Sequence, residues 1–259
     1  MCILLFAYDV HANYSLVVAA NRDEFYQRPT SSAQFWSDAE EIFAGRDLQA
    51  GGTWLGISKT GRFAGLTNIR EQPQIPTKSS LSRGLLVSTY LRETISPKAY
   101  LEAIYPTMMD YPGFNLLVGD HQELWYLANR GQAPPQRLGP GIYGLSNHLL
   151  NSPWPKVTWG RETLKSLLDT PMHSEKIFAM LGRAEYFADD QLPDTGVGLA
   201  HERMLSPLFI QSKLYGTCCS TLITADRTGV VQFYERDTNP LHPPSLDVNV
   251  QFMVQPYGL

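Results

Sequence analysis

The chain has 259 residues, of which 43% are hydrophobic, and a net charge of −4. This size suits one large domain or two small ones packed closely, and we predict a single domain over residues 1–259. The mild charge, without a block of Lys or Arg, argues against nucleic acid as a partner. No apolar run approaches the ~20 residues that a membrane span needs.

The predicted strands pair into four hairpins, because short turn-like stretches separate successive apolar runs. The paired ranges are 2–9 with 15–21, 52–58 with 62–68, 114–120 with 123–129, and 219–226 with 230–236. Further strands are predicted over 141–147 and, at a sheet edge, over 248–254. Apolar spacing predicts helices over 79–93, from Pro97 with Ser96 as the N-cap, over 154–168, and over 174–181 with Ser174 as the cap. The pattern indicates largely antiparallel sheets with helices packed outside.

The beginning of the chain does not have the pattern of a signal peptide. The first apolar run is short, no basic region precedes it, and Asp9 interrupts it. The three cysteines, Cys2, Cys218 and Cys219, are a poor disulfide framework, and no CxxC or zinc-spaced set is present. We therefore expect a soluble cytoplasmic protein without a metal site or covalently attached haem.

Cys2 follows the initiator methionine directly and heads a predicted central strand. One interpretation is a small buried apolar residue, as free cysteines often are. The other follows from its position, since methionine is usually removed before a small residue. The exposed α-amine, with an ordinary pKa of about 8, could then act as the general base for the thiol of the same residue. Cys2 is therefore a candidate N-terminal nucleophile.

The stretch Asn21-Arg22-Asp23-Glu24 places four polar residues directly after a buried run. It is either a solvated strand exit or part of a site near Cys2, to which the first hairpin can bring it. Arg22 could favour the thiolate, and Asp23 could accept a hydrogen bond from the α-ammonium or the thiol.

Asn68 and Asn147 end two other predicted strands. Each alone would be an ordinary turn residue. Together with Cys2 they suggest oxyanion donors that converge on one cleft. The nearby GGTWLG stretch lacks the Lys-Ser/Thr ending of a phosphate loop, so its two glycines, Gly51 and Gly52, are expected to open a tight turn.

Several motifs together resemble one known family: MCILLFAYD, NRDEF, GGTWLG, LTNIRE, FNLLVGD, YGLSNHLLNSPWPK and the YGT stretch before Cys218. This is the NRDE family, also called the transport and Golgi organisation protein 2 family. The motifs extend from residue 2 to about residue 236. The resemblance implies an α+β fold: a four-layer αββα sandwich of the N-terminal nucleophile hydrolase type, with two mostly antiparallel sheets covered by helices. The family is similar to the cysteine branch that includes bile-salt hydrolase and penicillin V acylase.

By that resemblance Cys2 would be the nucleophile, Arg22 and Asp23 would flank it, and Asn68 and Asn147 would lie near the oxyanion. The cysteine branch also has a late arginine, which many NRDE relatives place after YGT. This sequence has Cys218 there. A neutral thiol cannot replace a guanidinium in charge stabilisation, so the substitution argues against amide hydrolysis and for binding.

The family is associated with intracellular haem trafficking, so the resemblance implies non-covalent haem binding, with haem donor or acceptor proteins as partners. The candidate haem contacts are His148, Cys218, Tyr215 and Arg22, the last for the propionates. Haem binding on a hydrolase-like scaffold is the first functional hypothesis. The alternatives are a cysteine amidohydrolase acting on a small amide through Cys2, and a scaffold that binds an acidic metabolite through Arg22.

Overall fold

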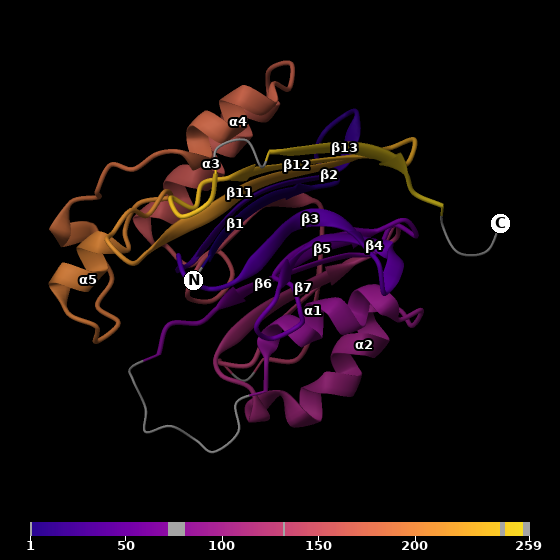
Figure 1. Ribbon diagram of the computed structural model, residues 1–259, viewed down its shortest axis with the longest axis horizontal. Helices are drawn as coiled ribbons and strands as arrows, with labels where there is room; N and C mark the ends of the chain where they lie inside the picture. Colours follow the sequence, from indigo (N-terminus) through magenta and orange to yellow (C-terminus); the bar gives the residue numbers. More distant parts are fainter. Residues whose placement is uncertain (1, 72–80, 132, 244–246, 256–259) are drawn as a thin grey trace.

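Two antiparallel β-sheets pack face to face in the computed structural model, and helices cover the outer face of each (Figure 1). The structure describes residues 2–71, 81–131, 133–243 and 247–255. The expected α+β fold, a four-layer αββα sandwich, is confirmed. Residues 79 and 80 of the first predicted helix lie outside the described residues.

The first sheet has six strands in the order β10-β1-β2-β11-β12-β13. Their bounds are β1 Cys2–Tyr8, β2 Tyr14–Phe25, β10 Gly141–Leu145, β11 Tyr215–Asp226, β12 Val230–Asp237 and β13 Val248–Met253. The two longest strands, β2 and β11, lie side by side at its centre and are buried along most of their length. The strand predicted at an edge, β13, is indeed the last one in this sheet.

The second sheet has seven strands in sequence order, β3 to β9. Their bounds are β3 Thr30–Trp36, β4 Ala39–Asp47, β5 Leu55–Ser58, β6 Phe63–Asn68, β7 Phe114–Gly119, β8 Leu124–Ala128 and β9 Gln136–Leu138. The sequence did not predict β3, β4 or β9. The pairing of β3 with β4 shifts register twice, which breaks the two-residue alternation that identifies a strand.

Two helices cover each sheet: α1 and α2 lie on the second sheet, and α3 and α4 on the first (Figure 1). The helices are α1 Arg83–Arg92, α2 Pro97–Ile104, α3 Pro155–Leu168, α4 Ser174–Leu181 and α5 Leu199–Met204. Ser96 caps α2 as predicted, since its hydroxyl accepts a hydrogen bond from Ala99 N at 3.2 Å. The prediction for Ser174 was wrong: it is the first residue of α4, and His173 is the N-cap. The sequence pattern did not predict α5.

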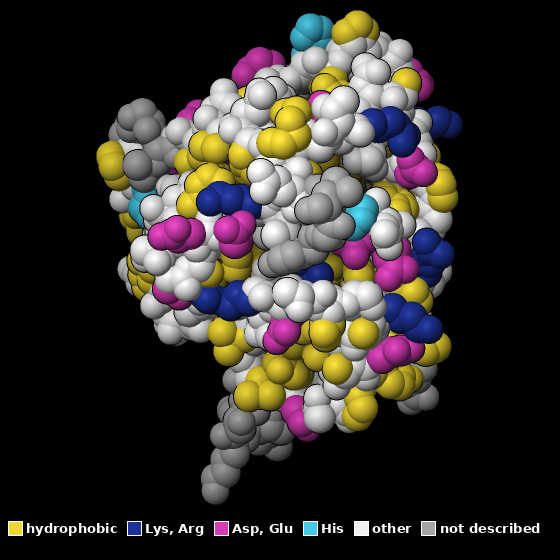
Figure 2. Space-filling model, turned by 90° about the vertical axis from the view of Figure 1, so that its right-hand side faces the viewer, with side chains coloured by type: hydrophobic (Ala, Val, Ile, Leu, Met, Phe, Trp, Pro, Cys, Tyr) yellow, Lys and Arg dark blue, Asp and Glu magenta, His cyan; other side chains and the backbone are white. Residues whose placement is uncertain are grey.

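The main core lies between the two sheets and is mostly aliphatic, with several aromatic rings packed within it. The ring of Phe43 in the second sheet lies 5.0 Å from that of Phe233 in the first, and Phe6 stacks on Tyr143 at 5.1 Å. No helix in the described part of the chain combines the length and the apolar character that crossing a bilayer requires. Figure 2 shows one end of the sandwich, where Lys and Arg side chains are interspersed with Asp and Glu.

Strand register brings distant parts of the sequence to the opposite end of the sandwich. Cys2 on β1 pairs directly with Arg22 on β2, and Arg22 pairs with Cys219 on β11. Directly paired residues project from the same face of a sheet. The first hairpin therefore places the thiol of Cys2 and the guanidinium of Arg22 side by side, facing the second sheet.

Candidate functional site

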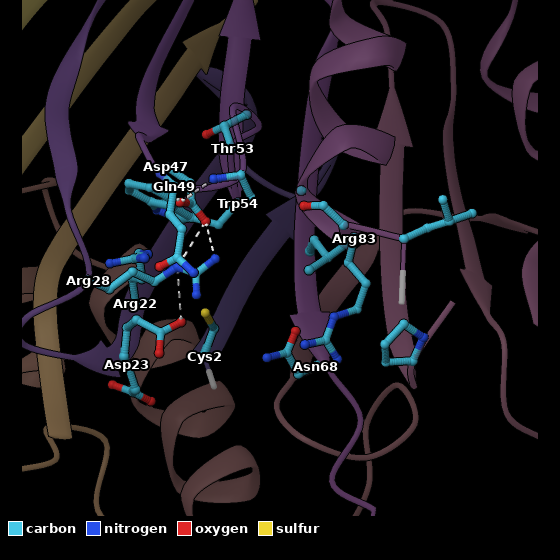
Figure 3. A pocket seen from close by; sticks show the side chains of 17 residues that line it. Cys2, Arg22, Asp23, Arg28, Asp47, Gln49, Thr53, Trp54, Asn68 and Arg83 are labelled. Carbon is cyan, nitrogen blue, oxygen red and sulfur yellow. Dashed lines mark hydrogen bonds and ion pairs between the residues drawn. The ribbon is translucent and has the colours of Figure 1, made fainter. Parts of the chain in front are cut away.

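A cavity of about 370 Å³ opens at this end of the molecule. Its walls come from the start of β1, the end of β2, the 47–54 loop, the end of β6 and the start of α1. Four of the five predicted catalytic residues line it, namely Cys2, Arg22, Asp23 and Asn68. Figure 3 shows the Cys2 sulfur projecting into this hollow, with Arg22 and Asp23 on its own side and Asn68 and Arg83 across from it.

The Cys2 thiol lies at the edge of the first sheet, where Cys2 is half-buried and lines the cavity. Burial is the main reason that its pKa is raised above the ordinary value, and the charge of Asp23 raises it further. Arg22 and a hydrogen bond from the Asp23 backbone act in the opposite direction. The thiol is therefore mainly protonated at neutral pH and requires a base before it can attack a carbonyl carbon.

Arg22 is a buried cation that lines the cavity. Its side chain is 6% exposed, and its guanidinium carbon lies 4.3 Å from the ring centroid of Trp54. Within the described part of the chain, no group accepts a hydrogen bond from this guanidinium. The Trp54 ring orients the cation while its donors remain available to a ligand.

Asp23 is held on the adjoining wall by groups from β11. The hydroxyl of Thr217 donates to its carboxylate at 2.7 Å, and the hydroxyl of Tyr215 donates to its backbone oxygen at 3.1 Å. Burial raises the pKa of the carboxyl, while the nearby ammonium of Lys156, the bond from Thr217 and the Arg22 guanidinium lower it. Tyr215 thus supports the backbone of the site and does not line the cavity.

Asn21, the first residue of the NRDE stretch, has a structural role. The Asn21 amide donates to the carbonyls of Leu181 and Leu208 at 2.9 and 2.8 Å, and its oxygen accepts from Ser220 at 2.6 Å. Asn21 therefore fastens β2 to the helical layer. The interpretation as a solvated strand exit was wrong, because β2 continues to Phe25 and Asn21, Arg22 and Asp23 are all buried.

Only one of the two expected oxyanion asparagines lines the cavity. Asn68 lies at the end of β6, faces the hollow and is half-buried. The Asn147 side chain instead donates to the Asn68 backbone oxygen at 3.0 Å, and its own backbone oxygen accepts from Arg70 N at 2.8 Å. Asn147 is therefore a positioning residue for Asn68.

The residues predicted as haem contacts, other than Arg22, lie outside the cavity lining. His148 is exposed, and its ring shares a hydrogen bond of 2.7 Å with Ser152. Cys218 lies at a bulge in β11, where its thiol faces the backbone oxygens of Glu24 and Gly216 at 3.6 Å. Burial raises the pKa of the Cys218 thiol to about 11.

Sequence reasoning missed a buried cation that acts on Asp23 from outside the cavity lining, and one part of the cavity wall. Lys156, in the first turn of α3, is 3% exposed and donates to the Leu205 carbonyl at 2.9 Å. Burial lowers its pKa to about 8, partly offset by Asp23. The other missed part is the start of α1, where Ser82 and Gly84 line the cavity. The YGLSNHLLNSPWPK motif contains Lys156, and was the one available signal for it.

The GG pair closes the turn over residues 48–50 instead of opening one, since Gly51 N donates to the Asp47 backbone oxygen at 2.8 Å, and it also supports the cavity wall. Gly51 has φ +78°, which glycine adopts without strain. At Gly52, a Cβ atom would lie 2.4 Å from the carbonyl carbon and 2.6 Å from the carbonyl oxygen of Gly84. The missing side chain therefore allows the turn to lie directly against the start of α1.

We expect Gly52→Ala to lower the free energy of unfolding by about 2 kcal/mol, because the added methyl group would force two backbone segments apart. Urea unfolding would measure the change. The matched control is Gly139→Ala, since a Cβ there meets nothing within 4 Å, and its stability should change by less than about 1 kcal/mol. Equal stability of the two variants would contradict the close packing of Gly52 against Gly84.

Comparisons with solved structures find distant similarities. One is to a Caenorhabditis elegans ortholog of N-acylethanolamine-hydrolyzing acid amidase, with 9% identity, a TM-score of 0.49, and coverage of 86% of this chain and 92% of that one. Another is to penicillin V acylase from Agrobacterium tumefaciens, with 10% identity, a TM-score of 0.47, and coverage of 92% and 87%.

Comparisons of sequence find much nearer relatives. A Transport and Golgi organization protein 2 homolog from Bos taurus is 35% identical over 257 residues, which cover 91% of this chain and 92% of the relative. The Drosophila melanogaster protein of that name is 26% identical, with 94% of each chain covered. The model of the Transport and Golgi organisation 2 family matches residues 1–240. The chain therefore belongs to the Transport and Golgi organisation 2 family.

Proposed function

We propose that this protein is a cysteine hydrolase of the N-terminal nucleophile type, which cleaves the C–N bond of a small amide through Cys2. The observation that carries the proposal is the position of the Cys2 sulfur, in a cavity shared with Arg22, Asp23 and Asn68. A thiol, a cation and a carboxamide around one hollow are the components that acyl transfer requires.

The proposed reaction begins when the α-amine of Cys2, freed by removal of Met1, takes the thiol proton. The sulfur then attacks the substrate carbonyl carbon, and the Asn68 amide stabilises the oxyanion. The carbon–nitrogen bond breaks as the leaving amine takes the proton back from the α-ammonium. Water, deprotonated by the same amine, hydrolyses the thioester and restores the thiol. Asp23 would orient the α-ammonium throughout.

The absence of the late arginine counts less against hydrolysis than the sequence suggested. The side chain of Cys218, at that position, does not line the cavity. A different cation, the buried ammonium of Lys156, lies close enough to Asp23 for each to shift the pKa of the other. In our proposal Lys156 therefore supplies the positive charge that balances Asp23.

Haem binding and haem trafficking stay predictions, and the residues of this cavity fit a haem poorly. Cofactor pockets are usually mostly apolar, whereas six of the lining residues are charged: Arg22, Asp23, Glu24, Arg28, Asp47 and Arg83. Of the described lining residues, only Cys2 could supply an axial ligand. Arg22 and Arg83 could hold propionates, but few of the described lining residues are apolar, namely Ala50, Trp54, Leu66, Leu81 and Pro112.

Intact-mass spectrometry of the purified protein, followed by incubation with a panel of small amides, tests the proposal. We expect the mass of a chain that begins at Cys2, release of amine, and an acyl adduct on Cys2 in rapidly quenched samples. Retention of Met1 on all of the protein would contradict the mechanism, because the backbone nitrogen of Cys2 would then be an amide and could not act as a base.

A further inference from the structure

We propose that the cavity contains an anion-binding subsite formed by the start of α1, Arg83 and Arg22, so that the substrate carries a carboxylate or phosphate group. That the bound anion belongs to a substrate rests on the proposed function, but anion binding itself does not depend on turnover. The enzyme would accept amides that carry an anionic group a short distance from the scissile bond.

The charges of the cavity wall separate into paired and unpaired groups. Arg28 donates two hydrogen bonds to one oxygen of Asp47, at 3.0 and 2.8 Å, and Glu24 lies 3.9 Å from the same guanidinium. Arg28 is therefore engaged directly by Asp47 and more loosely by Glu24, and it is not available to a ligand. Asp23 is held by Thr217 and faces the ammonium of Lys156. Arg22 and Arg83 are left as the cations available to a ligand.

Arg22 provides the strongest indication of a missing ligand. Its side chain is 94% buried, lines the cavity, and within the described residues donates no hydrogen bond and forms no ion pair. A buried guanidinium whose N–H groups donate no hydrogen bond lowers the stability of the fold, unless a ligand accepts those hydrogen bonds part of the time. Guanidinium groups bind carboxylate and phosphate oxygens in a planar, two-pronged geometry.

The start of α1 provides a second, independent source of donors. The first backbone N–H groups of a helix lack partners within the helix and attract anions. In α1 the first turn contains no acidic residue, and the N-cap Ser82 makes no side-chain capping bond. Ser82, Arg83 and Gly84 all line the cavity. The close contact with Gly52 fixes this helix end in place.

Arg83 adds a full charge at the same point. Its guanidinium donates to the Gly113 carbonyl at 2.9 Å and, in the described chain, pairs with no carboxylate. Figure 3 shows Arg83 projecting toward Asn68 from the wall opposite Arg22, with the Cys2 sulfur between the two arginines. An anionic group held by Arg83 and the helix end would place the rest of the ligand over Cys2.

Protection of Cys2 from alkylation measures this binding without requiring hydrolysis. Wild-type protein is treated with neutral iodoacetamide in the presence of glutarate, inorganic phosphate or the neutral diamide glutaramide, and labelling of Cys2 is followed by mass spectrometry. We expect saturable protection by glutarate or phosphate and none by glutaramide at equal concentration. The anion that protects better identifies the chemical source of the group.

Arg83→Gln tests the assignment of the subsite, and Arg137→Gln, at a side chain 62% exposed on β9, is the matched control. The first variant should bind the protecting anion about tenfold more weakly, equivalent to about 1.4 kcal/mol, and the second should match wild type. Equal protection by anion and diamide, or by wild type and Arg83→Gln, would overturn the proposal. If Arg83→Gln does not fold, loss of wild-type protection in high salt replaces it as the test.

Discussion

Cys2→Ala is expected to reduce amide hydrolysis by about a thousandfold or more, because it removes the sulfur that forms the acyl intermediate in the proposed reaction. The folded structure should persist, since Cys2 is half-buried at the end of β1 and its loss leaves the hairpin register unchanged. The measurement is kcat/KM for whichever amide the panel identifies, together with loss of the adduct in quenched samples.

The matched control is Ser166→Ala, a similar small deletion at an exposed position of α3 far from the cavity lining. Its rate should equal that of wild type. Cys2→Ser separates the role of sulfur from that of the α-amine, because serine keeps the amine and offers a weaker nucleophile. A Cys2→Ala variant that retains a tenth of wild-type turnover would show that the reaction does not pass through Cys2.

Glu235→Gln is expected to make the protein more stable at neutral and alkaline pH, by about 3 kcal/mol. Glu235 is 3% exposed in the core between the sheets, and one of its oxygens accepts from Ala33 N at 2.7 Å. Its second oxygen has no hydrogen-bond partner among the described residues. Burial is the main reason that the pKa of this carboxyl is raised to about 7.

The sign of the effect follows from proton binding. Between pH 4.5, the ordinary pKa of Glu, and pH 7, the folded state retains the proton that the unfolded state releases. Stability due to Glu235 is therefore complete below this window, falls as pH rises through it, and is lost above it. Gln cannot ionise and still offers an oxygen to Ala33. Urea unfolding of both proteins from pH 4.5 to 8 should give a difference that grows with pH, and a constant difference would contradict the raised pKa.

Much of the fold could be predicted because its hairpins are local. Each predicted pair of runs is contiguous in sequence, and turn residues such as Gly61 and Gly229, both at positive φ, mark the reversals. Two of the strands that escaped prediction, β3 and β4, pair with shifts in register and carry many polar residues. These two strands form one edge of the second sheet, next to β5, and their pairing within the folded protein determines their structure more than the local sequence pattern does.

The site could be predicted in part for the same reason. The pairing of Cys2 with Arg22 follows from one hairpin, so it was within reach of sequence reasoning. Asn68 and Asn147 come from different sheets, and only the packing of those sheets decides which side chain faces the hollow and which supports the other. Lys156 was missed because a helix pattern identifies its apolar face, and a buried ammonium contradicts that pattern.

The central position of β2 gives the NRDE stretch two directions at once. Asn21 reaches the carbonyls of the helical layer, while Arg22, one residue later, stacks on Trp54 between the sheets. Alternation of this kind tolerates no change in spacing. Deleting one residue ahead of position 21 would place Arg22 where Asn21 now binds the helical layer, and Asp23 where Arg22 now faces the cavity. The function of the NRDE stretch therefore depends on the position of each residue along β2 as much as on which residues it contains.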